Sequence, residues 1–369
     1  MPTFTGTLGN DVLVGSPDAD TLIGLAGNDN IFGLEGDDSL EGNEDSDSLN
    51  GNQGQDTVRG GAGDDWVRGG RGNDLLWGDA GNDFLHGDRG NDTALGGEGD
   101  DLLFGDEPFA GIGNDVLYGE AGNDILFGLA GNDQLFGGDG DDILMGNQGQ
   151  DTLDGDDGND VVFGGRGDDV LFGNAGNDLI HGDLGAETVT GGEGNDIFVI
   201  GRRFDVPGFR TTGGPTPTDA DYITDFKPGQ DLIALIGTLT FEDLNFFNVN
   251  PGNAMIQDKG TGEFLAILQG INASDIKGID FFPPGNTTNP GILSFTAANY
   301  SDNEGNSGTP NKMVATIQRT DGSDGIVTVQ VQLGEGSTAT PNDFTNNLPI
   351  TVTFNPGDTS KTCLLYTSD

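Results

Sequence analysis

Apolar residues recur once in every nine residues along the first half of the chain. Each unit starts with Gly, continues through two variable residues to Gly-Asn-Asp, and ends with three residues of which the middle one, the eighth, is apolar, as in "GEAGNDILFGLAGNDQLF" from Gly119 to Phe136. Because side chains alternate along a strand, only the eighth side chain of a unit would point inward. The pattern predicts a turn and a very short strand in every unit.

The units continue in register from Gly6 to Val199, twenty-one in all, and one of them carries five extra residues, Glu107 to Gly111. If two units make one coil, strands of successive coils stack in parallel about 4.8 Å apart, and about ten coils make a rod about 50 Å long. Gly at the first and fourth positions would supply backbone conformations that residues with a Cβ resist. We predict an all-β fold whose residues 1–200 form a parallel β-roll, a β-helix-like solenoid with a thin Leu, Ile and Val core.

The sixth position of the unit is Asp in every case but one, Glu187. Stacking places these carboxylates in columns of like charge, and at an effective dielectric near 20 each facing pair repels by roughly 3 kcal/mol. One buried apolar side chain per unit contributes only about 1.5–3 kcal/mol before conformational entropy is subtracted. With a net charge of −48, 67 glycines and 33% hydrophobic residues, the bare chain lies near the disordered class. The bare rod should therefore not fold.

A divalent cation between paired carboxylates would reverse the sign of this repulsion. The site would offer only hard oxygen ligands, carboxylates and turn carbonyls, on a flexible turn, which favours Ca²⁺ over zinc, copper or magnesium. Metal binding would then supply the folding free energy. Fewer sites are expected near Asp18, Asp45, Glu187 and the five-residue insertion, where the pattern is interrupted. The candidate calcium ligands of the repeat are Asp11, Asp20, Asp29, Asp38, Asp47, Asp56, Asp65, Asp74, Asp83, Asp92, Asp101, Asp115, Asp124, Asp133, Asp142, Asp151, Asp160, Asp169, Asp178 and Asp196.

The repeat resembles the RTX, or haemolysin-type, calcium-binding nonapeptide, a calcium-binding β-helix motif. The resemblance covers residues 6–199. It implies a parallel β-roll that binds several calcium ions in the turns between coils, with the sixth-position aspartates as ligands. It also implies an extracellular protein whose roll folds after export.

Residues 201–282 lack the nine-residue period and contain more aromatic side chains. The stretch "DYITDFKPGQDLIAL" (Asp221 to Leu235) predicts two strands joined by a turn, and "NAMIQDKGTGEFLAIL" (Asn253 to Leu268) predicts a hairpin. We expect this segment to cover the last coil of the roll, and it resembles the segment that commonly follows RTX repeats. Its Asp221, Asp225 and Asp231 either cap strand ends, the role we favour, or bind a further ion.

Residues 283–291 form a Pro, Gly and Asn linker, and four strand-like runs at the spacing of an antiparallel sandwich follow it. Residues 292–362 resemble a Calx-beta domain, through "YSDNEG", "QRTDGSDG", "GEGSTATPNDF" and "NPGDTSKT" in that order. The resemblance places Glu304 and Asp343 at calcium-ligand positions. The closing strand of that family should follow Thr362.

The last seven residues, "CLLYTSD" from Cys363 to Asp369, resemble an in-frame translation of a transposase sequencing adapter. Our hypothesis is that residues 363–369 are not biological and that the natural reading frame is longer. In that case Cys363 has no redox meaning, and one edge of the sandwich is left unpaired.

The composition excludes several functions. The strongly acidic charge excludes a nucleic-acid partner, no apolar run is long enough to span a membrane, and "MPTFTGTLGN" is not a secretory signal, so export would use another signal. No GxSxG, HExxH or phosphate-loop motif occurs, so no catalytic residue is assigned. His86 and His181 both take the ninth position of a unit and are expected to be surface strand residues.

The best-supported interpretation is a secreted bacterial calcium-binding modular protein, not an enzyme, with a structural or adhesive role towards cell-surface or matrix components. The alternative is the repeat region of a larger exported enzyme or toxin, and a complete gene would distinguish the two. An intracellular calcium buffer is disfavoured, because the cytosolic calcium concentration is far below the about 10⁻⁴–10⁻³ M at which extracellular calcium modules bind. The sequence leaves the oligomeric state open.

Overall fold

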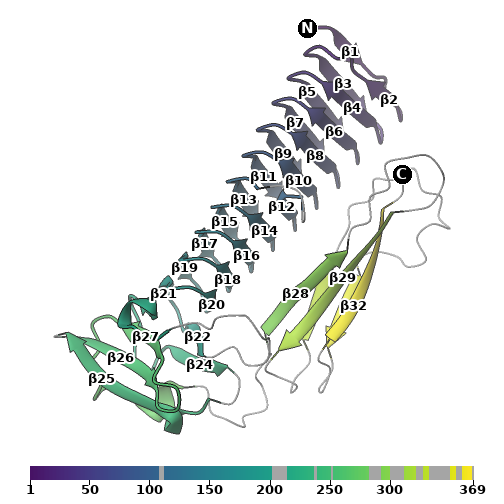
Figure 1. Cartoon of the computed structure of the whole chain (residues 1–369). Coiled ribbons are helices and arrows are strands. Elements are labelled where there is room, and N and C mark those ends of the chain that lie inside the picture. Colours follow the sequence, from purple (N-terminus) through teal and green to yellow (C-terminus); the bar gives the residue numbers. More distant parts are fainter. Residues whose placement is uncertain are drawn as a thin grey trace. The chain divides into compact units, whose positions relative to one another are not determined.

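The computed structural model describes residues 1–107, 112–201, 214–236, 239–250 and 252–281, together with five strands between residues 292 and 367. The chain divides into two compact units, Met1–Pro284 and Gly285–Asp369, and each is described by itself (Figure 1). Helix is limited, in the described residues, to the short 3₁₀ turns η1 (Pro217–Asp219), η2 (Phe241–Asp243) and η3 (Gly278–Asp280). The all-β prediction is confirmed. No helix of the described residues is both long and apolar enough to cross a membrane.

The first unit contains a parallel β-solenoid of eleven coils, with its odd-numbered strands in one sheet and its even-numbered strands in the other (Figure 1). The odd strands are β1 (Thr3–Thr5), β3 (Thr21–Ala26), β5 (Ser39–Glu44), β7 (Thr57–Ala62), β9 (Leu75–Ala80), β11 (Thr93–Glu98), β13 (Val116–Ala121), β15 (Gln134–Asp139), β17 (Thr152–Asp157), β19 (Val170–Ala175) and β21 (Thr188–Glu193). The even strands are β2 (Val12–Val14), β4 (Asn30–Glu35), β6 (Ser48–Gln53), β8 (Trp66–Arg71), β10 (Phe84–Arg89), β12 (Leu102–Asp106), β14 (Ile125–Ala130), β16 (Ile143–Gln148), β18 (Val161–Arg166), β20 (Leu179–Leu184) and β22 (Ile197–Gly201).

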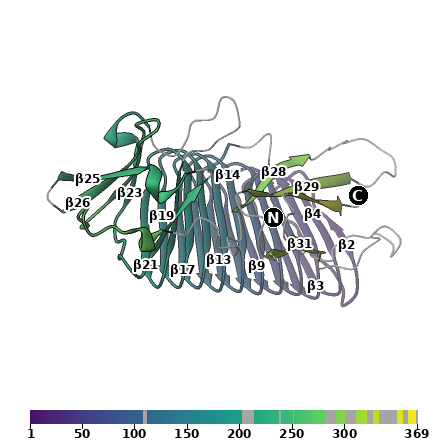
Figure 2. The ribbon, with the colours of Figure 1, turned by 90° about the horizontal axis from the view of Figure 1, so that it is seen from below.

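Each strand pairs in parallel with the strand two places further along the chain, so that two nonapeptide units complete one coil. Leu126 of β14 is opposite Leu144 of β16, eighteen residues later, and Figure 2 shows the strands of the roll side by side. The predicted parallel roll is confirmed. The strand β1 precedes the first nonapeptide, which begins at Gly6, and was not predicted. Most strands are also longer than predicted, because they continue from the seventh position of one unit to the third position of the next.

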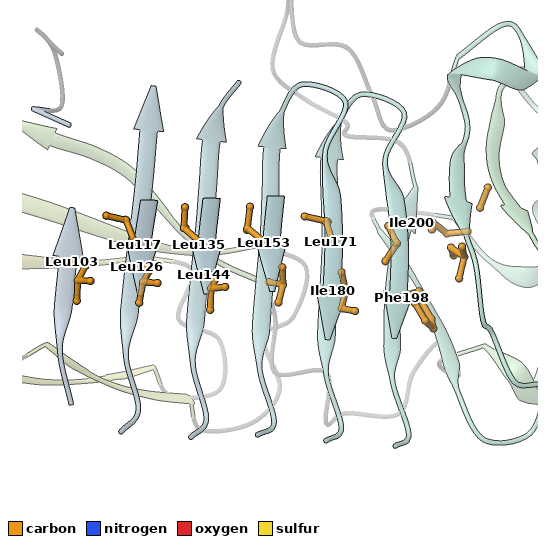
Figure 3. Packing of buried hydrophobic residues seen from close by; sticks show 14 of the residues in the cluster. Leu103, Leu117, Leu126, Leu135, Leu144, Leu153, Leu171, Ile180, Phe198 and Ile200 are labelled. Atoms are coloured by element: carbon orange, nitrogen blue, oxygen red, sulfur yellow. The ribbon is translucent and has the colours of Figure 1, made fainter. Parts of the chain in front are cut away.

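The core is a double file of the eighth side chains, as the pattern predicts. The residue at the eighth position of every unit from Leu22 to Phe198 is buried. Figure 3 shows two rows along the roll, with Leu117 and Leu135 in one row and Leu126 and Leu144 in the other. Even Ala94, the smallest of them, has no exposed surface. The core is one side chain thick on each sheet, so its stability must grow coil by coil.

The glycines at the first and fourth positions have different roles, and the prediction for the first position is wrong. Fourth-position glycines such as Gly122 have φ of +143°, in the region that favours glycine. First-position glycines do not have positive φ; the second-position residues that follow them do, as at Glu120 with φ 77°. Gly119 is required instead for space, since a Cβ there would lie under 3.0 Å from both Asp124 Oδ2 and the carbonyl oxygen of Gly137.

The segment after the repeats continues both sheets of the roll. The strands β23 (Asp221–Ile223) and β24 (Leu232–Ile236) pair in parallel with β21 and β22, and so extend both sheets by one strand. The strands β25 (Leu244–Asn250), β26 (Asn253–Asp258) and β27 (Phe264–Leu268) then complete the odd sheet. The antiparallel pairing of β26 with β27 is the predicted hairpin. The strand β25 was not predicted.

The second unit contains two antiparallel sheets. The strands β28 (Ile292–Asn299), β29 (Asn311–Thr320) and β32 (Ser360–Thr367) form one, and β30 (Val327–Val331) and β31 (Ile350–Phe354) form the other. Four of these strands lie in the four predicted runs. The expectation that the edge beyond Thr362 is unpaired is wrong, because Cys363 to Thr367 pair with β29 as part of β32. The linker 283–291, Glu304 and Asp343 lie outside the described residues.

Candidate metal centre

The sixth-position carboxylates form two columns, one at the start of each sheet's strands, because successive coils are in register. From Asp20 onward every one of them is buried, with at most 3% of its surface exposed, and Asp11 is half-buried. The odd-sheet column contains Asp20, Asp38, Asp56, Asp74, Asp92, Asp115, Asp133, Asp151, Asp169 and Glu187, and the even-sheet column contains Asp11, Asp29, Asp47, Asp65, Asp83, Asp101, Asp124, Asp142, Asp160, Asp178 and Asp196.

One oxygen of each carboxylate joins two coils. The backbone N–H of Asp124 donates to Asp142 Oδ1 at 2.7 Å, and that of Asp133 donates to Asp151 Oδ1 at 2.8 Å. The same bond crosses the five-residue insertion, where the N–H of Asp101 donates to Asp124 Oδ1 at 2.7 Å. The carboxylate columns therefore satisfy backbone donors throughout the roll.

The other oxygen of these carboxylates is buried and has no hydrogen-bond partner. This holds for Oδ2 in Asp124, Asp133 and Asp142, and in the other column aspartates from Asp29 to Asp196. Each Oδ2 lies beside the first-position glycine of its own unit, and the carbonyl oxygen of the next coil's first-position glycine lies beside the same point, as at Gly119 and Gly137. A buried polar atom without a partner is costly unless a ligand satisfies it.

The donor set of this cradle fits calcium. It consists only of carboxylate and carbonyl oxygens, which hard divalent cations prefer, on turns that can adjust to the irregular coordination of Ca²⁺. No group of three or more Asp, Glu, His or Cys side chains that could hold a metal occurs in the described residues. Side chains alone therefore do not complete a site, and turn carbonyls such as that of Gly137 would have to contribute.

Burial raises the pKa of the column carboxyls well above the ordinary range. The pKa of Asp124 is raised to about 7, that of Asp133 to about 8 and that of Asp101 to about 9, first by loss of hydration and then by the charges of neighbouring column aspartates. The bond from the preceding coil's N–H acts in the opposite direction. Without a bound cation, the folded columns thus disfavour the charged carboxylates they contain.

The columns continue beyond the repeats into the cap. Asp231, directly before β24, accepts the N–H of Asp196 through Oδ1 at 3.3 Å, as the column residues do. Asp221, the first residue of β23, takes the same place beside Glu187 and accepts its backbone N–H through Oδ1 at 3.5 Å. Burial, together with the side-chain hydrogen bond to Asp221, raises the pKa of Glu187 to about 12. Asp225 instead accepts the N–H groups of Gly191 and Gly192 at 2.9 and 2.8 Å. These bonds support the capping role that we favoured for the three aspartates.

A second ladder was not predicted, although the repeated Asn or Asp of the fifth position could have indicated it. The N–H of Asn132 donates to Asn114 Oδ1 at 2.7 Å, and that of Gln150 donates to Asn132 Oδ1 at 2.8 Å. Here the acceptor lies in the preceding coil, whereas a sixth-position N–H donates to the following coil. Adjacent residues thus join each coil to both of its neighbours.

The prediction that the two histidines are surface residues is wrong for His181. This side chain is buried, with 5% of its surface exposed, and its ring is edge-on to Phe163 at 6.0 Å. His86 is half-buried, stacks on Phe104 at 5.6 Å and places Nδ1 2.8 Å from Asp88 Oδ1. Against the effect of burial, His86 and Arg68 lower the pKa of Asp88 to about 2. The ninth position points outward, but apolar ninth-position residues of neighbouring strands in the same sheet cover the two histidines, as Phe104 covers His86 and Phe163 covers His181.

Two parallel sheets with buried oxygen cradles in their turns define a β-roll of the cation-binding class. The family of the RTX calcium-binding nonapeptide repeat matches residues 5–40, 41–76, 77–107, 109–135, 136–171 and 163–198. Since these segments cover more than half of the sequence, the chain belongs to this family of calcium-binding repeat proteins.

Two solved structures resemble parts of the chain. The solution structure of the AlgE6R3 subunit from the Azotobacter vinelandii mannuronan C5-epimerase is 25% identical, with 47% of this chain and 91% of that one covered and a TM-score of 0.26. The crystal structure of the extracellular lipase LipA from Serratia marcescens is 16% identical, with 71% of this chain and 40% of that one covered and a TM-score of 0.18. No protein of curated function matches the sequence.

Proposed function

We propose that this chain is the calcium-binding part of a secreted bacterial modular protein and that its roll folds when calcium binds in the turns. The observation that carries the proposal is the repeated Oδ2 atom, buried and without a partner, beside a glycine carbonyl oxygen of the next coil. The proposed ligands are the sixth-position aspartates of the two columns. Asp11 and Asp20 begin the columns, and Glu187 is the weakest candidate because its raised pKa favours the neutral acid.

Electrostatics supports folding coupled to binding. The columns stack carboxylates in a chain whose net charge is −48, and burial alone already disfavours their ionised form. A bound Ca²⁺ would supply positive charge between them and replace lost hydration. Because the cradle needs ligands from two successive coils, calcium affinity and coil stacking are one equilibrium.

An extracellular location agrees with this chemistry. Proteins with this repeat are typically secreted, and extracellular calcium modules bind at about 10⁻⁴–10⁻³ M, concentrations that are met outside the cell. A roll of this kind would stay unfolded before export and fold afterwards. The segment after the roll would act as an RTX-associated cap, and the second unit as a Calx-beta-like module with Glu304 and Asp343 as further ligands. An adhesive or structural role follows from such modules in tandem.

The test is a calcium titration of the full chain, followed by far-UV circular dichroism and hydrodynamic radius. In EDTA we expect an expanded chain with little β-structure, and in millimolar Ca²⁺ a cooperative change to a compact β-fold. Mg²⁺ at the same concentration is the control and should be much less effective, because it demands strict octahedral geometry and releases water reluctantly. A roll that is equally folded in EDTA would refute the proposal.

A further inference from the structure

The last turn of the even-sheet column, which ends at Asp196, is built differently from the turns before it. One coil earlier, a Cβ at Gly173 would lie under 3.0 Å from Asp178 Oδ2 and from the carbonyl oxygen of Gly191, the carboxylate and carbonyl pair of the calcium cradle. At Gly191 the nearest atoms to the same point are Asp196 Oδ2 and Cζ of Phe198, an aromatic carbon at 2.8 Å. A hard cation gains no ligand from an aromatic ring, so this turn is a poor place for Ca²⁺.

Two side chains from the segment after the repeats bind the carbonyl oxygens of this turn. Within the roll, the carbonyl oxygens at the second and fourth positions of a turn face the following coil. At the last turn these positions are Gly192 and Gly194, and the segment after the repeats takes the place of a following coil. The Lys227 ammonium donates to the carbonyl of Gly192, and the Gln230 side-chain amide donates to that of Gly194. Lys227, which is half-buried, therefore places a positive charge at the end of the column.

This positive charge lies among buried carboxylates. Asp196 and Asp231 are each 1% exposed, and burial raises the pKa of both. Backbone hydrogen bonds and the charge of Lys227 act in the opposite direction on both carboxyls. At Asp124, in the middle of the column, the neighbouring charges that act on the pKa of the carboxyl are negative and raise it. The last turn thus carries a cation of its own.

The backbone completes the compensation at Asp231. Its Oδ2 accepts the N–H of Lys227 at 2.7 Å, and its Oδ1 accepts the N–H of Asp196 at 3.3 Å. Both oxygens of Asp231 are therefore hydrogen-bonded, whereas Oδ2 of an interior aspartate such as Asp124 is buried and has no partner. The column ends on a carboxylate that needs no further cation.

We propose that Lys227 is the fixed counter-ion of the last turn of the even-sheet column, in the place of the calcium ion that the preceding turns bind. Asp196 then does not ligate calcium, and the calcium ligands of this column end at Asp178. An ammonium group offers three N–H donors and one charge to the surrounding oxygens, and its charge would repel a Ca²⁺ ion at the same turn. Because it is covalently attached, it also stays when calcium is withdrawn. This inference rests on the proposed calcium-dependent folding of the roll and narrows its set of ligands.

Two substitutions one coil apart in the same column test which aspartates ligate calcium. Asp178→Asn and Asp196→Asn both remove a negative charge and keep an oxygen that can accept the N–H of the preceding coil. In a calcium titration of the full chain followed by circular dichroism, we expect Asp178→Asn to raise the midpoint about twofold or more, because a ligand is weakened. Asp196→Asn should leave the midpoint where it is in the parent chain. An equal rise in both variants would refute the proposal.

A second experiment tests the charge of Lys227 directly, in saturating calcium. Lys227→Met leaves the carboxylates at the end of the column without their counter-ion and should raise the amide hydrogen exchange rates of residues 221–236 about tenfold or more. Lys227→Arg keeps the charge and should have a much smaller effect. Lys259→Met is the matched control, because Lys259 donates to the carbonyl of Glu242 at 2.6 Å from the turn between β26 and β27. It removes the same charge and the same kind of hydrogen bond, and should change these rates little.

Combining the substitutions separates charge from packing. In an Asp231→Asn background one of the two carboxylates is neutral, so Lys227→Met should increase exchange much less than in the parent chain. An equal increase in both backgrounds, or in Lys227→Met and Lys259→Met alike, would show that Lys227 acts through packing or net charge alone. Either result would refute the proposal and leave the proposed function intact. A parent chain that is equally folded in EDTA would refute the proposed function itself.

Discussion

The backbone N–H of Asp124 donates a hydrogen bond of 2.7 Å to Oδ1 of Asp142, one coil further along the roll. The same carboxylate keeps Oδ2 buried and unpartnered. Each column carboxylate therefore has two separate roles: Oδ1 accepts a backbone hydrogen bond, and Oδ2 is free to bind a cation. Substitutions that keep the hydrogen bond but remove the charge can separate the two contributions to stability.

Replacing Asp124 and Asp142 with Asn keeps an oxygen that can accept the backbone N–H but removes two negative charges. We expect the calcium midpoint of folding to rise roughly threefold to tenfold, because one stacked pair of ligands is weakened while the other coils remain. Circular dichroism during calcium titration measures it. The control Asp139→Asn/Asp157→Asn changes the same charge at exposed positions outside the columns and should not raise the midpoint. An equal rise in both variants would assign the effect to net charge.

Gly119 and Glu120 are adjacent, yet substitutions at the two should have opposite effects. In Gly119→Ala the new Cβ would collide with Asp124 Oδ2 and the carbonyl of Gly137, so we expect weaker calcium binding and a less stable roll. Glu120 has φ 77°, so Glu120→Gly relieves a backbone conformation unfavourable to L-residues and should stabilise the folded state by up to about 1 kcal/mol. Urea unfolding in saturating calcium checks both. Destabilisation by Glu120→Gly would contradict this account of the second position.

The one-residue-thick core predicts a steep cost for truncation at the eighth position. Leu126 has no exposed surface, and Leu126→Ala should lower the free energy of unfolding in saturating calcium by about 2–5 kcal/mol. Ile125→Ala is the neighbouring control; its side chain is only half-buried on the outer face, so the loss should be distinctly smaller. Chemical denaturation measures both values. Similar losses for the two residues would show that the outer face contributes as much as the core.

The raised pKa values predict how pH acts on the calcium-free chain. A carboxyl whose pKa rises from about 4 in the unfolded chain to about 7 at Asp124 or about 8 at Asp133 stabilises the fold at low pH. That contribution is fully present below about pH 4 and is lost as the pH rises through about 7 to 8. In EDTA, the content of β-structure should therefore increase as the pH is lowered from 8 to about 5. This range lies above the isoelectric point of about 4.1.

Calcium should reverse the pH trend, because protons compete with the cation for the same carboxylates. The calcium midpoint is thus expected to rise on acidification. Sodium chloride at fixed pH serves as the control for general screening of the net charge. A chain that is equally disordered at both pH values in EDTA would contradict the protonation argument.

The repeat allowed the solenoid, its core and both carboxylate columns to be predicted, because one register applied to every coil fixes which side chains stack. Leu126 and Asp124 are examples in which position within the unit determined the environment. His181 was mispredicted because its burial depends on Phe163 and other neighbours of the ninth position, which vary from unit to unit. The role of Gly119 was also mispredicted, since crowding by Gly137 of the next coil is not visible within one unit. Asp231 shows the same limit, because its place in the column depends on the pairing of β24 with β22.

The five extra residues from Glu107 to Gly111 leave the columns unbroken, since Asp92 still donates to Asp115 Oδ1 at 2.8 Å across the longer chain separation. The chain can therefore lengthen between the second and third positions of a unit while the hydrogen bonds of the carboxylate columns keep their partners. This position is a natural attachment point. A foreign peptide inserted there would be displayed at a defined distance along a calcium-controlled scaffold, and it would be presented only when the ion is present.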